Sequence, residues 1–117
     1  MVSLYVNNTP ILVLWEENNS VEELFSLLKN GAITIHTERY GGFEQVGSLP
    51  QSITSDDKQM TTAAGDIVLY NGNSIVLFYG SNSWTYTKLG RIDGMPAEEI
   101  TTLLNVEKMD ITISSVE

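Results

Sequence analysis

The 117-residue sequence contains no cysteine. This absence excludes disulfide bonds, thiolate nucleophiles, iron–sulfur clusters and cysteine-based zinc sites. Histidine is nearly absent as well, because His36 is the only one. A Ser-His-Asp triad would have to use it, but no G-x-S-x-G motif is present, so a half-exposed histidine on a strand is the favoured interpretation. Asp56 and Asp57 lack the glycine and the spaced oxygen ligands of a calcium loop. We therefore expect no metal and no cofactor.

Positive charge is scarce. Six Lys and Arg residues stand against fifteen Asp and Glu residues, which gives a formal net charge of -9. The cations are scattered singly along the chain, whereas proteins that bind phosphate backbones or anionic lipids need Lys and Arg in clusters. We expect neither a nucleic acid nor a membrane as partner.

Long hydrophobic runs are also missing. The longest, Ile75 to Tyr79, suits a buried strand and is far shorter than the roughly 18 residues that cross a bilayer. Residues 1–7 have no basic segment followed by an apolar one, so we expect a cytoplasmic protein, although an export signal already removed would leave no trace. The length predicts a single domain, residues 1–117, with one core. Nothing in the sequence indicates the oligomeric state.

Most of the chain shows the alternation of apolar and polar residues that is typical of β-strands. Asn71-Gly72 predicts a tight hairpin turn, because both residues tolerate a positive φ. Gly41-Gly42 interrupts another strand and predicts a bulge or a close approach of backbone, and the polar residues 54–57 predict a loop. The expected strands lie near residues 4–6, 11–15, 33–35, 40–46, 67–70, 75–79, 86–92 and 109–113.

Two segments have helical spacing instead. Residues 20–29 place apolar side chains at i, i+3, i+4 and i+7, and Ser20 with Glu23 matches a capping box at the start. The second segment covers residues 96–104, with Pro96 at a position that suits the first turn of a helix. Both helices should lie against a sheet.

A spaced series of motifs between Gly41 and Ile92 resembles the small bacterial cyclophilin-like family. The motifs are Gly41-Gly42-Phe43-Glu44, Leu49-Pro50, Gly65-Asp66-Ile67-Val68-Leu69-Tyr70, Ile75-Val76-Leu77-Phe78-Tyr79-Gly80 and Ser83-Trp84-Thr85-Tyr86-Thr87-Lys88-Leu89-Gly90-Arg91-Ile92. The resemblance implies a mainly β fold, a cyclophilin-like closed antiparallel β-barrel capped by one or two short helices. It implies little about function, because the family is named for its fold.

True cyclophilins are peptidyl-prolyl isomerases. The resemblance therefore raises the question of whether the residues of their active site are present in this sequence. Cyclophilins use an apolar pocket for the proline ring and an arginine that hydrogen-bonds the twisted amide, within F-H-R followed by G-F-x-x-Q-G-G-D. Arg39 resembles the catalytic arginine and Phe43 resembles a pocket phenylalanine. Three features depart from the pattern: Arg39 and Phe43 are one residue too close, Glu44 stands where an apolar side chain should line the pocket, and Q-G-G-D is missing.

These observations predict a binding domain that lacks efficient prolyl isomerase activity. Its groove for a peptide or a small molecule is expected on the outer face of the barrel, near Arg39, Phe43, Glu44, Trp84 and Tyr86. The alternative is a divergent peptidyl-prolyl isomerase in which Arg39 is the catalytic residue, and a third interpretation is a structural or oligomer-forming module. For Arg39, a surface ion pair with Glu38 or Glu44 is as well supported as contact with a ligand.

Overall fold

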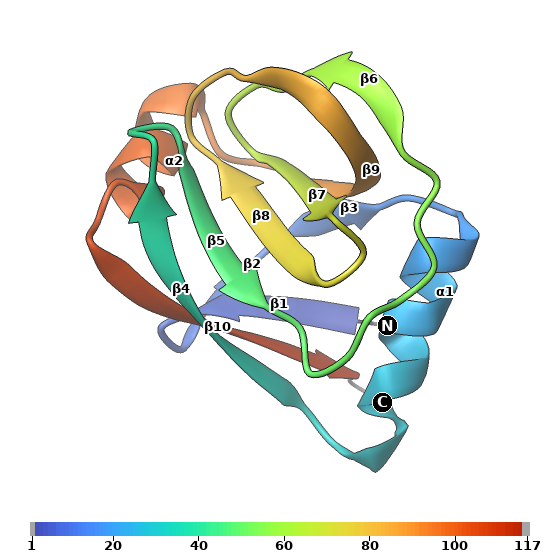
Figure 1. Cartoon of the computed structure of the whole chain (residues 1–117). Helices are drawn as coiled ribbons and strands as arrows, with labels where there is room; N and C mark the ends of the chain where they lie inside the picture. The colour runs from blue at the N-terminus through green and yellow to red at the C-terminus, as the bar shows by residue number, and fades with distance from the viewer. Residues whose placement is uncertain (1, 116–117) are drawn as a thin grey trace.

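The structure is a computed structural model that describes residues 2–115 of the chain (Figure 1). Within these residues the chain forms mainly β-strands, together with two α-helices and one 3-10 helix. The strands are β1 (Val2–Val6), β2 (Thr9–Ile11), β3 (Val13–Trp15), β4 (Ile33–Tyr40), β5 (Glu44–Ser48), β6 (Lys58–Thr61), β7 (Asp66–Tyr70), β8 (Ser74–Phe78), β9 (Ser83–Ile92) and β10 (Lys108–Ser115). The helices are α1 (Asn19–Ser26), η1 (Leu27–Asn30) and α2 (Ala97–Leu104).

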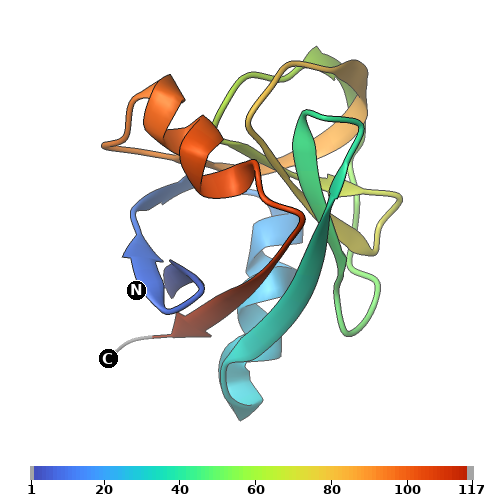
Figure 2. The ribbon, with the colours of Figure 1, turned by 90° about the vertical axis from the view of Figure 1, so that its left-hand side faces the viewer.

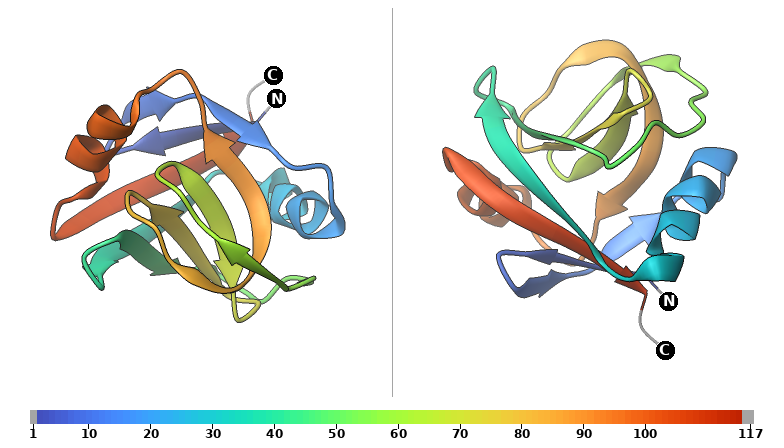
Figure 3. Two further views of the ribbon diagram at one scale, coloured as in Figure 1. Left: turned by 90° about the horizontal axis from the view of Figure 1, so that it is seen from above. Right: turned by 60° about the horizontal axis from the view of Figure 1, so that its bottom comes forward.

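Nine of these strands form one nearly closed antiparallel barrel, in the order β2-β1-β10-β4-β5-β8-β7-β9-β3, and β6 pairs with β9 beside it. The two strands at the ends of this path, β2 and β3, are separated along the chain by Leu12 alone. The covalent chain therefore bridges the gap in the hydrogen-bonded ladder, as the view from above shows (Figure 3). The predicted mainly β, antiparallel barrel is confirmed.

The core fills the inside of the barrel, and the two helices lie at opposite ends of it (Figures 2 and 3). The apolar faces predicted for both helices are buried, with Leu24 of α1 and Leu104 of α2 completely inaccessible. Within residues 2–115, neither helix has the length and apolar character that crossing a membrane would require.

The central hairpin β7–β8 is buried on both of its faces. Ile67 and Leu77 belong to the core inside the barrel, whereas Val68, Val76 and Phe78 belong to a second apolar cluster on the outer face. Successive side chains of a strand point to opposite faces, so a continuously apolar strand must be covered twice. The outer cluster also includes Tyr86 of β9, with Phe43, Val46 and Met60 packed against it.

The capping box expected at Ser20 and Glu23 is wrong. Helix α1 begins one residue earlier, and its N-cap is Asn18, whose side chain accepts a hydrogen bond from the amide of Val21 at 2.8 Å. Ser20 is buried and donates to the carbonyl of Thr54, while a carboxylate oxygen of Glu23 accepts from the amide of Thr54 at 3.0 Å. Both side chains therefore fasten the long β5–β6 connection to the helix, a contact that local spacing cannot indicate.

Two details of the strand pattern also differ from expectation. Gly41 and Gly42 form the turn between β4 and β5 with φ of 65° and 74°, rather than a bulge within one strand. The sequence pattern gives no signal for strand β6, because its side chains are largely exposed and carry no apolar alternation. The hairpin turn at Asn71-Gly72 is confirmed, with φ of 55° and 73° at the two residues.

Candidate ligand-binding site

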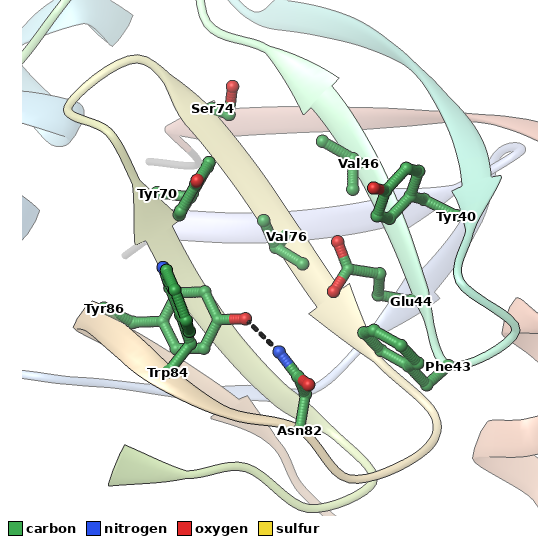
Figure 4. A pocket seen from close by; sticks show the side chains of 10 residues that line it. All are labelled: Tyr40, Phe43, Glu44, Val46, Tyr70, Ser74, Val76, Asn82, Trp84 and Tyr86. Carbon is green, nitrogen blue, oxygen red and sulfur yellow. Dashed lines mark hydrogen bonds between the residues drawn. The ribbon is translucent and has the colours of Figure 1, made fainter. Parts of the chain in front are cut away.

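A pocket of about 420 Å³ opens on the outer face of the barrel (Figure 4). Its floor is the apolar outer surface of β5 and β8, and its walls come from β4, β7, β9 and the two connections that follow β4 and β8. The lining residues are Tyr40, Phe43, Glu44, Val46, Tyr70, Ser74, Val76, Asn82, Trp84 and Tyr86.

Strand alternation and one tight turn aim these side chains into the pocket. On β5, Glu44 and Val46 point outward, while Gln45 between them points inward and donates to the carbonyl of Leu104 at 2.8 Å. Phe43 is fixed by its backbone, because its carbonyl accepts from the amides of Tyr79 at 2.9 Å and Gly80 at 3.0 Å.

Gly80 makes this attachment of the turn to the barrel feasible. A Cβ atom at Gly80 would lie 2.8 Å from the Cβ of Phe43, a distance that real Cβ atoms essentially never show. A glycine at this position therefore lets the β4–β5 turn approach the end of β8 closely enough to hold the Phe43 ring at the pocket wall.

Aromatic side chains form most of the walls. Tyr86 is buried and accepts a hydrogen bond from the amide nitrogen of Asn82 at 2.7 Å, and its ring packs edge-on against that of Tyr70 with centroids 6.0 Å apart. Trp84 and Tyr40 are 56% and 67% exposed, so the rim offers large aromatic surfaces to solvent. Such rings supply contact area at a small cost in side-chain entropy.

Glu44 is the one lining residue that carries a carboxylate, and it is only 7% exposed. Its carboxylate points toward the centre of the pocket, near Val76 (Figure 4). Within residues 2–115, no hydrogen-bond donor and no cationic side chain contacts this carboxylate. Burial raises the pKa of Glu44 from 4.5 to about 7, because the charged form loses hydration without gaining a partner.

The phenol of Tyr86 shares this environment. Burial is the largest cause that raises its pKa, and the nearby charge of Glu44 acts in the same direction. The hydrogen bond from Asn82 opposes the shift. The pocket is therefore an apolar, aromatic space that contains a single unpartnered acid.

The structure brings four of the five predicted site residues together: Phe43, Glu44, Trp84 and Tyr86 all line this pocket. The sequence motifs missed Tyr40, Tyr70 and Asn82. Alternation could have indicated Tyr70, because it shares a face of β7 with outward-pointing Val68. No comparable signal marks Asn82, whose position depends on the β8–β9 connection.

Arg39 does not line the pocket. It is the register partner of inward-pointing Gln45 on β5, so its side chain leaves the opposite face of the β4–β5 hairpin. There its guanidinium donates to the side-chain oxygen of Asn105 at 3.1 Å. Among the residues that the structure describes, Arg39 forms no ion pair with Glu38 or Glu44.

A second, more polar depression adjoins the pocket across β5, where Val46 lines both. In it, His36 on β4 and Asp110 on β10 are joined by a 2.6 Å contact between Nδ1 and Oδ1, and both side chains are exposed. Ser48 lines the same depression, but among the described residues no hydrogen bond links its hydroxyl to His36. The three do not form a nucleophile–base–acid relay here.

A model described as a cyclophilin-like family matches residues 4–114. The chain belongs to the cyclophilin-like family. The match extends the resemblance seen between Gly41 and Ile92 to nearly the whole sequence. No curated protein matches the chain.

This cyclophilin-like chain has the barrel and an aromatic side chain at Phe43. The positions of its arginine and of its pocket differ from those in the prolyl isomerases of the cyclophilin fold. The isomerase arrangement requires an arginine beside an apolar pocket. Here the pocket contains Glu44, and Arg39 lies on the other face of the hairpin. Family membership defines the architecture of the protein and does not by itself define its activity.

Proposed function

We propose that the chain is a ligand-binding domain whose pocket on the outer barrel face takes a small molecule or one side chain of a peptide. The observation that carries this proposal is the lining of the pocket, in which aromatic side chains from several strands surround one acid, Glu44. The volume of about 420 Å³ lies within the roughly 300–1,000 Å³ that ligand sites usually enclose. The lining also has the composition expected of such sites, namely aromatic walls and few polar groups.

We also propose that prolyl isomerisation is weak or absent. The barrier to rotation about an X-Pro bond is about 20 kcal/mol and falls when a donor stabilises the twisted amide. The residues that line the pocket include no Lys or Arg, and Arg39 is directed elsewhere. A proline ring placed there would contact the carboxylate of Glu44 instead.

Binding is tested with nitrogen-15-labelled protein and a library of small neutral and charged fragments. We expect some fragments to shift amide resonances of β5 and β9 together. The Trp84→Ala substitution should reduce these shifts, because it removes part of the pocket wall. Fragments that bind only elsewhere, or none that bind, would contradict the proposal. Replacing Trp15, the other tryptophan, with Phe leaves the fluorescence of Trp84 as a second report on the pocket.

Isomerisation is tested with a proline tetrapeptide at low temperature, where the uncatalysed rate is slowest. We expect a rate enhancement at least about a hundredfold below that of an ordinary cyclophilin, which corresponds to roughly 2.7 kcal/mol of transition-state stabilisation. Comparable activity that Arg39→Ala abolishes would establish the alternative, a divergent peptidyl-prolyl isomerase.

A further inference from the structure

We propose that the pocket selects an organic cation, specifically a methylated ammonium group surrounded by aromatic rings and paired with Glu44. This inference rests on the binding function proposed above and names its ligand class. It combines three observations that point in the same direction: the placement of Glu44, the aromatic walls, and the absence of competing positive charge.

Glu44 is the first observation. The residue is more than nine-tenths buried and its carboxylate faces the pocket, yet no donor or cation within residues 2–115 contacts that carboxylate. Buried carboxylates elsewhere in proteins are normally paired, because an isolated buried charge is costly. A cation in the pocket would supply the partner that the fold itself does not provide.

The aromatic walls are the second observation. Tyr40, Phe43, Tyr70, Trp84 and Tyr86 come from different segments and surround the space in front of the carboxylate (Figure 4). The negative face of an aromatic ring attracts cations, and cages of several rings recognise quaternary ammonium ligands. Tyr40 and Trp84 at the rim are exposed, so their rings are accessible to a ligand.

The same walls favour an organic cation over a metal ion. Calcium and magnesium require about six or more oxygen ligands, including several carboxylates or waters. This pocket has a single carboxylate, and its floor is the apolar surface of Val46 and Val76. Methyl groups on nitrogen lower the need for hydrogen-bond acceptors, so a methylated ammonium loses less on entering such a space than a fully hydrated cation does.

Charge is the third observation. Among residues 2–115, no Lys or Arg lines the pocket, and the formal net charge of the chain is -9. The summed field of an acidic protein raises the local concentration of cations and accelerates their association. An anionic ligand would meet both this field and the carboxylate of Glu44.

The state of Glu44 makes binding depend on pH. Its pKa of about 7 in the free protein means that protonation competes with the cation below neutrality, so affinity should rise from pH 6 to pH 8. The other titratable groups facing it are the phenols of Tyr40, Tyr70 and Tyr86. The charged groups of the adjacent strands, His36, Glu38, Lys108 and Asp110, line the separate depression.

The experiment compares choline with its uncharged isostere 3,3-dimethylbutan-1-ol at pH 8 and constant ionic strength. Binding is followed by amide shifts and by the fluorescence of Trp84 in the Trp15→Phe protein. We expect choline to bind at least about tenfold more tightly than the alcohol, as a cation in a desolvated aromatic site should. Glu44→Gln should reduce this preference below about threefold, because the shape is kept and the charge removed. Glu107→Gln removes an exposed carboxylate outside the pocket and should leave the preference unchanged.

A second arm distinguishes the source of the ammonium group. A short peptide with trimethyllysine is compared with the same peptide carrying the uncharged residue norleucine. If the trimethyllysine peptide binds more tightly than choline, the ligand is a peptide. If choline binds more tightly than the trimethyllysine peptide, the ligand is a small molecule. Equal binding of choline and the alcohol would overturn the cation inference while leaving a ligand-binding pocket, and a preference that survives Glu44→Gln would overturn the pairing of the cation with Glu44. If choline fails but neutral fragments shift the pocket, the cation inference alone is wrong. If nothing shifts the pocket, both proposals fail.

Discussion

Glu44→Gln should gain stability relative to the wild type as the pH rises from 4.5 to 8, because it replaces a buried ionisable side chain by a neutral one of the same shape. In the folded chain, burial raises the pKa of Glu44 from 4.5 to about 7. The folded state therefore holds this proton more tightly than the unfolded state does. The contribution of this protonation to the free energy of unfolding is fully present below pH 4.5 and is lost as the pH rises through 7.

The size of the effect follows from the shift. Each pKa unit is worth about 1.4 kcal/mol, so a rise from 4.5 to about 7 corresponds to about 3 kcal/mol between pH 4 and pH 8. Glutamine does not titrate, so the variant lacks this loss. The pH-independent cost of burying the amide is the same at both pH values and cancels when the two are compared.

Urea denaturation of both proteins at pH 4.5, 6, 7 and 8 measures the free energy of unfolding. The advantage of Glu44→Gln over the wild type should grow by about 3 kcal/mol across this range, whereas Glu107→Gln, at an exposed position, should track the wild type. Parallel pH profiles for Glu44→Gln and the wild type would refute the reasoning, because they would mean that the carboxylate is hydrated or partnered in solution.

Three further substitutions test the fold, each by urea or thermal denaturation. Gly72→Val should destabilise the protein by about 1 kcal/mol or more, because φ is 73° there, and an unchanged melting curve would count against the turn. Gly47→Ala should cost about 1–3 kcal/mol, since its Cβ would lie 2.6 Å from a methyl of Ile35, and full stability would show that the strands separate easily. Tyr79→Phe should be neutral or stabilising by up to about 1 kcal/mol, because its buried hydroxyl has no partner within residues 2–115, and a clear loss would reveal a hidden hydrogen bond.

The sequence determined the local elements and the class of the fold. Asn71-Gly72 specified its hairpin because few residue pairs adopt two successive positive φ values. The apolar run from Ile75 to Tyr79 indicated a buried strand, and the spacing of Val21, Leu24 and Leu28 defined the buried face of the first helical segment. These are properties of neighbouring residues, so they can be read along the chain.

The site depended on the tertiary structure. Pairing of Arg39 with Gln45, rather than with Glu44, sends the arginine to the other face of the hairpin, because a shift of one residue in a strand reverses every side chain. Tyr70 and Trp84 share a pocket only because β8, β7 and β9 lie side by side. That no residue within 2–115 partners Glu44 likewise depends on how the other strands pack around it, and burial by these strands raises the pKa of its carboxyl group.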